Sequence, residues 1–113
     1  MATTRKPSLP LHAYGETYNV HTDISHYTNN GNLAICLNDI NEGPFATLTV
    51  NIDPLGSPSL AAVDTNNCSW AEAFIKEHSL GKFTGMSLRS GFCTYPVYDF
   101  DLDKLKDYGY ELE

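Results

Sequence analysis

Residues 17–24 have the sequence Thr-Tyr-Asn-Val-His-Thr-Asp-Ile, in which aromatic or β-branched side chains alternate with polar ones. Successive side chains of a β-strand point to opposite faces, so this alternation predicts a strand with one face buried and the other in water. The buried face is expected to carry Tyr18, Val20, Thr22 and Ile24.

More strands are predicted on both sides of this one. Residues 33–37 alternate in the same way, residues 45–52 are rich in β-forming side chains, and residues 8–13 can add a short strand in front. Asn, Asp, Gly and Pro in residues 28–31 and 39–44 predict turns, and such short connections favour an antiparallel meander. In the strand over residues 45–52, the inward face is expected to carry Ala46, Leu48, Val50 and Ile52.

The main helix is predicted over residues 70–80, after a short apolar strand at residues 60–63. Ser69 and Glu72 match the Ser-x-x-Glu pattern of a capping box, in which each side chain accepts a backbone N–H at the start of a helix. Gly81 stands where a left-handed residue often ends a helix.

The last third of the chain is predicted to hold a loop, a strand and a short helix. Residues 85–91 are expected to form the loop, and the aromatic residues 92–100 the strand, in which Pro96 requires an edge position or a bulge. Asp101 is expected to cap a helix over residues 102–108 that Gly109 closes.

These elements predict a single α+β domain over residues 1–113, with residues 1–7 flexible. We expect a four- to five-stranded, mainly antiparallel sheet, with the main helix packed on one face and the short C-terminal helix after it. One helix of this length can cover only one face of such a sheet. The other face is left to solvent or to a partner.

Composition narrows the classes of function. The 113 residues include 14 Asp and Glu against 7 Lys and Arg, a formal net charge of −7. Phosphate binding needs Lys and Arg, so direct nucleic-acid binding is not expected. No apolar run approaches the ~20 residues of a membrane helix, and no secretory signal follows the N-terminus, so we expect a cytoplasmic protein without a membrane partner.

The sequence contains no enzyme signature, and we expect neither an enzyme nor a bound metal or cofactor. The four histidines lack metal-ligand spacing, and the three cysteines are expected to be reduced thiols. An alternative is a thiol-dependent enzyme in which Cys93 is the nucleophile and His12 or His78 the base.

The clearest charged feature is the C-terminal tract. Asp99, Asp101 and Asp103 alternate, so they would share one side if the last strand continued through them. An acidic row of this kind, with tyrosines beside it, is suited to a protein partner with a basic surface; the alternative is a solvated edge. The residues predicted to bind the partner are Asp99, Asp101, Asp103, Asp107, Tyr108, Tyr110 and Glu111.

Four tracts carry a resemblance to a known family: residues 29–35 (Asn-Asn-Gly-Asn-Leu-Ala-Ile), 44–51 (Pro-Phe-Ala-Thr-Leu-Thr-Val-Asn), 73–77 (Ala-Phe-Ile-Lys-Glu) and 90–96 (Ser-Gly-Phe-Cys-Thr-Tyr-Pro). In this order they resemble an uncharacterised family of small proteins from gut Firmicutes and their plasmids, phages and conjugative elements, known as a domain of unknown function. The resemblance covers roughly residues 9–105 and supplies no catalytic residues.

The resemblance implies that the gene lies among the accessory genes of mobile elements. The products of such genes include inhibitors of host defence. We therefore expect a non-enzymatic acidic binding protein of a mobile element, such as an anti-CRISPR inhibitor of a Cas9-type nuclease, whose nucleic-acid channel is positively charged. A further alternative is an accessory module that acts by self-association, and the sequence leaves the oligomeric state open.

Overall fold

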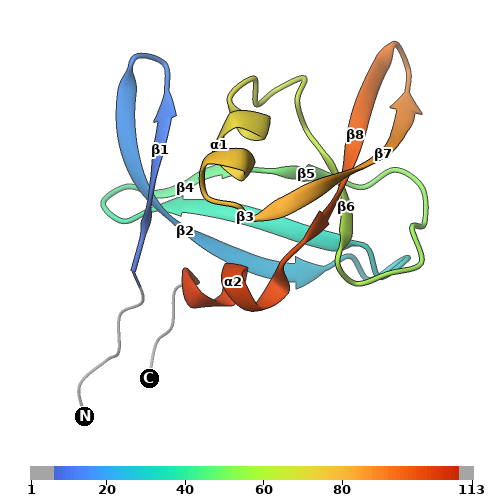
Figure 1. Ribbon diagram of the computed structural model, residues 1–113, viewed down its shortest axis with the longest axis horizontal. Helices are drawn as coiled ribbons and strands as arrows, with labels where there is room; N and C mark the ends of the chain where they lie inside the picture. The colour runs from blue at the N-terminus through green and yellow to red at the C-terminus, as the bar shows by residue number, and fades with distance from the viewer. Residues whose placement is uncertain (1–6, 110–113) are drawn as a thin grey trace.

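The structure, a computed structural model, describes residues 7–109, and it contains two four-stranded antiparallel sheets instead of one. The first sheet has the order β1-β2-β3-β4 (Figure 1). Its strands follow one another in the chain, as a meander does. They are β1 (Leu9–Ala13), β2 (Glu16–His26), β3 (Leu33–Asp39) and β4 (Gly43–Thr47).

The second sheet has the order β5-β6-β8-β7, so its last two strands form a hairpin whose second strand lies inside the sheet. Among the strands of residues 7–109, β7 pairs only with β8 and is therefore an edge strand. The strands of this sheet are β5 (Thr49–Val50), β6 (Leu60–Val63), β7 (Gly81–Ser90) and β8 (Cys93–Phe100).

The two sheets are joined at Leu48, in the middle of what the sequence predicts as one strand. The Leu48 N–H donates to the carbonyl of Ile35 at 2.8 Å, while the Leu48 carbonyl accepts from Asp64 N–H at 2.9 Å, so its two hydrogen bonds enter different sheets. The alternation also changes here, because Thr49, predicted to face outward, is buried and its hydroxyl accepts from the Ile35 N–H. The expected single sheet is therefore wrong, although the α+β class holds.

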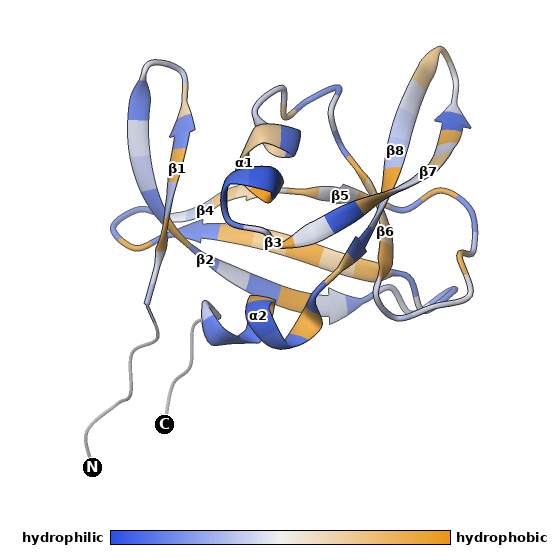
Figure 2. Cartoon of the chain, viewed as in Figure 1, coloured by the Kyte–Doolittle hydropathy of each residue, from blue (hydrophilic) through white to orange (hydrophobic). Residues whose placement is uncertain are grey.

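The core lies between the two sheets. Figure 2 shows apolar segments along β3 and β6, near the centre of the molecule. Leu33, Ile35 and Leu37 of β3 are almost completely buried, as their alternation predicts, and Ala61 and Val63 of β6 meet them from the second sheet.

The helix α1 (Ala71–Glu77) is shorter than predicted, and it contacts both sheets instead of packing on one face of a single sheet as expected. Trp70, its N-cap residue, packs against Phe45 of β4, and Glu72 accepts a hydrogen bond from Tyr98 of β8. The predicted capping box is wrong: the N-cap residue is Trp70 and not Ser69, no side chain of the described residues caps the helix, and the Glu72 carboxylate accepts from Tyr98 instead.

The end of α1 also differs from the prediction. The N–H of Leu80 bonds the carbonyl of Ile75 and that of Ser79 bonds Lys76, which is the Schellman pattern, so the left-handed residue is Ser79 (φ 53°) and not Gly81. Gly81 has a different role, because a Cβ there would lie 2.9 Å from the carbonyl oxygen of Asp99 in β8. The close approach of the two strands requires glycine.

The predicted loop over residues 85–91 is a strand, since all but Gly91 belong to β7. Pairing with β8 is irregular between Phe83 and Ser87, and Gly85 within that interval has φ 88°. Pro96 pairs with Ser87 next to the irregularity, and β6 reaches only Val97–Asp99 of β8. Both conditions predicted for a strand proline, a bulge and a local edge, are therefore met.

The C-terminal helix α2 (Leu102–Asp107) is confirmed together with its N-cap: Asp101 accepts from the Lys104 N–H at 3.1 Å. The predicted closure by a left-handed Gly109 is wrong, because the helix ends one residue earlier with Tyr108 as its C-cap and Gly109 does not have a positive φ. Leu105 is fully buried, and the carbonyl of Tyr108 accepts from the Thr22 N–H at 3.0 Å. β1 pairs with β2 only as far as Val20, so the end of α2 bonds β2 where β1 no longer does.

The sequence predicts that residues 1–7 are flexible. Of these residues, only Pro7 belongs to the described part of the chain. Within residues 7–109, neither helix is long and apolar enough to cross a membrane.

Candidate protein-interaction surface

The β7–β8 hairpin extends from the body of the protein, away from β1 (Figure 1). Its apolar side chains are unusually accessible: Phe83 is 54% exposed, Met86 is 50% exposed, and Phe92 in the turn is fully exposed. Large exposed rings on an open sheet edge are typical of a surface that binds another protein, because both the rings and the unpaired backbone groups gain from a partner.

A groove of roughly 600 Å³ lies at the base of this hairpin, beside the end of α1. Its apolar wall is a row of aromatic rings: the Phe83 and Tyr98 centroids lie 5.7 Å apart, and those of Tyr98 and Phe100 lie 6.0 Å apart. Its charged residues are of both signs, and they are Lys76, Lys82, Asp99 and Asp101.

Tyr98 fixes the hairpin to α1. Its hydroxyl donates to Glu72 Oε2 at 2.5 Å. Burial, together with the adjacent Glu72 carboxylate, raises the pKa of Tyr98 to about 12. The phenol is therefore neutral at pH 7 and remains a hydrogen-bond donor, which holds the aromatic wall of the groove in place.

Charge is unevenly distributed around this surface. Residues 81–98 contain two cationic side chains, Lys82 and Arg89, and no acidic one, whereas the chain as a whole has a net charge of −7. The acidic residues begin immediately after the hairpin, at Asp99 and Asp101. The hairpin is thus a weakly cationic, apolar projection above a groove in which two lysines and two aspartates balance.

The structure brings together only part of the predicted acidic site. β8 ends at Phe100 and the chain turns into α2, so the aspartates do not follow one strand. Asp99 is exposed and pairs in register with Lys82, and Asp101 caps α2; both line the groove. The other predicted residues of the described chain, Asp103, Asp107 and Tyr108, lie along α2 outside the groove lining, and Tyr110 and Glu111 fall outside the described residues.

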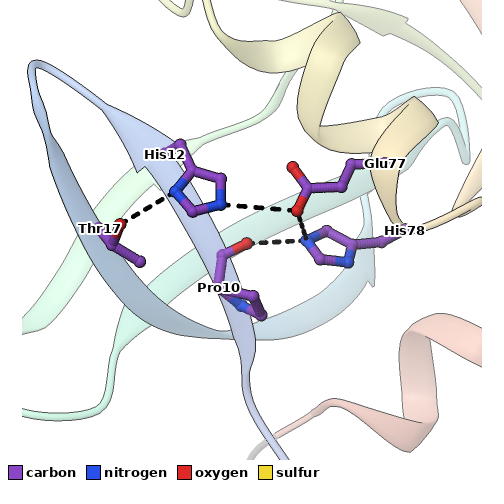
Figure 3. A network of polar contacts seen from close by, with 5 residues as sticks. All are labelled: Pro10, His12, Thr17, Glu77 and His78. Carbon is purple, nitrogen blue, oxygen red and sulfur yellow. Dashed lines mark hydrogen bonds and ion pairs between the residues drawn. The ribbon is translucent and has the colours of Figure 1, made fainter.

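A separate polar cluster joins α1 to β1 (Figure 3). His78 Nε2 donates to the carbonyl of Pro10 at 2.7 Å, and His12 Nδ1 lies 2.9 Å from Thr17 Oγ1. Glu77 Oε2 lies 3.6 Å from His12 Nε2 and 3.8 Å from His78 Nε2. These contacts connect the C-terminal end of α1 to the first hairpin.

The alternative thiol site is not assembled. Cys93 begins β8 next to the hairpin turn, whereas His12 and His78 are engaged in the cluster at β1 and α1. The thiol contacts Tyr95 instead, and that contact is the main reason why the pKa of Tyr95 is raised. Within residues 7–109, no three His, Cys, Asp or Glu side chains gather where they could hold a metal ion.

Sequence reasoning missed the exposed apolar residues of the hairpin, because residues 85–91 are predicted as a loop. A usable sign was present: Phe83, Met86 and Leu88 are apolar residues spaced through a segment that directly precedes a predicted strand. If this segment is taken as a strand, the short glycine-containing connection Ser90-Gly91-Phe92 to the next strand predicts a β-hairpin.

The fold and this surface define a small α+β domain with two joined antiparallel sheets and an open, apolar edge. The chain belongs to the family described as Domain of unknown function (DUF4313), whose model matches residues 21–112. The expected membership of an uncharacterised family is therefore confirmed. Neither the curated proteins nor the solved structures gave a match to this chain.

Proposed function

We propose that this protein is a non-enzymatic binding domain that recognises another protein through the β7–β8 hairpin and the groove at its base. The observation that carries the proposal is the open β7 edge with the exposed rings of Phe83 and Phe92. Lys82, Arg89 and the irregularity at Gly85 protect the edge from indiscriminate pairing, and the apolar side chains remain available to a specific partner.

The partner we propose is a protein with a basic surface. The net charge of −7 favours such a partner. The carboxylates next to the apolar hairpin are those of Asp99 and Asp101, which share the groove with Lys76 and Lys82. Opposite charge at the rim of an apolar contact raises the association rate and makes it sensitive to salt. In its most specific form, the protein is a cytoplasmic product of a mobile element that inhibits a host defence nuclease of the Cas9 type. This form is supported by the net charge and by the family resemblance.

The test is co-purification and DNA cleavage with a panel of Cas9-type nucleases, each with and without guide RNA, at two salt concentrations. Binding that weakens with salt and abolishes cleavage would establish an inhibitor, and dependence on the guide would identify the step that it blocks. Failure to bind any nuclease would refute this form of the proposal.

Single substitutions then test the surface. Phe83→Ser and Phe92→Ser should abolish binding, whereas Ile40→Ser removes a similarly exposed side chain from the β3–β4 turn and should leave it unchanged. Asp99→Lys should weaken binding most at low salt, and Asp103→Lys, which lies on α2 outside the groove lining, should have a smaller effect. We leave Asp101 intact in this series because it also caps α2.

Self-association is a second candidate, favoured by the β7 edge, which can pair with the same edge of another copy to form a continuous sheet. Sedimentation velocity over a wide concentration range tests it directly. A monomer at the highest concentration would exclude this candidate without affecting the first.

A further inference from the structure

Another pocket, of roughly 370 Å³, lies beside the first sheet. It is lined by the β1–β2 turn, β4 and the loop that follows β6. Three aromatic residues line it: Tyr14, Phe45 and Trp70. It shares none of its lining residues with the groove at the base of the β7–β8 hairpin.

The aromatic residues form a corner. The Phe45 and Trp70 centroids lie 5.7 Å apart with 53° between the ring planes, so the two faces diverge instead of stacking. Trp70 Nε1 donates to the Tyr14 hydroxyl at 3.3 Å, which holds the Tyr14 ring beside the corner although that side chain is 70% exposed.

Tyr14 occupies an unfavourable backbone position. It has φ 54° and Gly15 has φ 76°, which is the pattern of a two-residue turn that favours Asn-Gly. A bulky side chain with positive φ destabilises the turn. Its presence is explained if the ring is needed at the mouth of this pocket.

The pocket also contains a carboxylate. Asp64 is 7% exposed, and it accepts hydrogen bonds from the backbone N–H and the side-chain amide of Asn67 at 3.2 and 2.9 Å. Within residues 7–109, no lysine or arginine forms an ion pair with it. A carboxylate has about four acceptor sites, so it can still accept hydrogen bonds from a further donor.

Among the described residues that line the pocket, Asp64 is the only one with a charged side chain. Cys68, which also lines it, is a neutral thiol at pH 7, because burial and the nearby Asp64 charge raise its pKa. A buried carboxylate without a cationic partner is costly, and aromatic faces attract cations, so both features of the pocket favour an organic cation.

We infer that this pocket binds the guanidinium group of an arginine side chain presented by the partner protein. A guanidinium is planar, stacks on aromatic rings and donates two parallel hydrogen bonds to a carboxylate, which matches the aromatic corner and the free acceptor sites of Asp64. The choice of a protein side chain rests on the proposed function, in which an acidic protein binds a basic partner.

The inference can be tested on the isolated protein. Trp70 is the only tryptophan in the chain, and it lines both this pocket and a neighbouring hollow at the β1–β2 turn that contains Glu16. Its fluorescence reports on both hollows, and the Asp64→Asn variant assigns the signal to this pocket. The probe is N-acetyl-arginine amide, titrated at constant ionic strength, with N-acetyltryptophan amide as a reference for collisional quenching. Its control is N-acetyl-citrulline amide, which has nearly the same shape and no charge.

We expect a saturable change with the arginine probe and none with citrulline. Asp64→Asn should weaken probe binding at least tenfold. Tyr14→Asn should weaken it about two- to fivefold while the protein becomes equally or more resistant to urea, because asparagine suits the turn. A merely structural role for Tyr14 would not separate these two effects.

No saturable change, an equal response to citrulline, or unchanged binding by folded Asp64→Asn would overturn the inference. Its failure is distinct from failure of the proposed function. If nuclease binding survives in Asp64→Asn and the probe does not bind, the arginine site is wrong and the hairpin surface stands. If the probe binds and no nuclease does, the pocket stands and the proposed target is wrong.

Discussion

Removing the hydroxyl of Tyr98 should lower stability at neutral pH and change how stability depends on pH. Tyr98→Phe keeps the ring that packs between Phe83 and Phe100 and deletes only the donor to Glu72. A hydrogen bond to a charged group contributes about 1.5–3 kcal/mol. Glu72 is on the exposed side of α1 and can be rehydrated, so we expect the lower limit, a loss of about 1.5 kcal/mol at pH 7.

The pH dependence follows from the raised pKa of Tyr98, about 12 against an ordinary value of 10.0. Below pH 10 the phenol is protonated in both the folded and the unfolded chain, so its full contribution to stability is present. Between pH 10 and 12 the unfolded chain loses this proton while the folded protein keeps it. The folded protein then binds more protons, and stability falls as the pH rises.

Linkage gives the size of this fall. A pKa raised by about two units corresponds to at most about 1.9 kcal/mol of lost stability by pH 11.5. Solvent around Glu72 screens part of the interaction, so we expect about 1–1.5 kcal/mol. The stability advantage of the natural protein over Tyr98→Phe should therefore nearly vanish by pH 11.5.

The assay is urea unfolding of both proteins under reducing conditions at several pH values from 7 to 11.5. Other titrating groups are common to both proteins, so their effects cancel in the difference. Glu72→Gln is the matched control, since it removes the charge and keeps an acceptor, and should reduce the slope of the difference. If the difference stays constant across this range, the hydroxyl is not held against Glu72 in solution and our account of the groove wall is wrong.

Four further predictions test the remaining features. Asp101→Ala should cost about 1 kcal/mol in urea unfolding through loss of the α2 cap, whereas Ser69→Ala should stay within about 0.5 kcal/mol because Ser69 caps nothing. Gly81→Ala should lower the free energy of unfolding in urea by about 1–3 kcal/mol, since its Cβ would meet the Asp99 carbonyl. An unchanged free energy of unfolding would mean that β7 can shift to accommodate the methyl group. Leu48→Ala should cost about 2–5 kcal/mol and increase amide exchange in both sheets, and an effect limited to one sheet would contradict its role as their junction. Serine is nearly isosteric with cysteine, so Cys93→Ser should leave both nuclease binding and inhibition unchanged; loss of inhibition with binding retained would revive the thiol-dependent alternative.

The elements that the sequence predicted correctly depend on neighbours along the chain. The alternation from Tyr18 to Ile24 and from Leu33 to Leu37 encodes which side chains avoid water, and both segments are strands with those residues inward. The outward faces depart from the prediction, because His21, which contacts the Tyr108 carbonyl at the end of α2, and Ala34 are buried as well. Asp101 caps α2 because its carboxylate needs only the N–H of Lys104, three residues away. Interactions between residues so close in the sequence can be predicted from the sequence pattern alone.

The errors occurred where a distant partner competed with a local one. Glu72 could have completed a capping box with Ser69, but it binds Tyr98, which is 26 residues away. Residues 85–90 have loop-like composition, and they form a strand because β8 pairs with them. In both cases the deciding contact lies outside any window that periodicity or capping rules examine.

The sequence by itself determined the acidic charge, the predominance of β-strands, the final capped helix and the lack of a catalytic motif. Only the tertiary structure decided that Leu48 divides one alternating run between two sheets, that β7 is an open edge, and that Asp64 lies among Tyr14, Phe45 and Trp70. The physical reason is that alternation records how side chains divide between water and core, whereas strand partners and pockets depend on which distant segments meet.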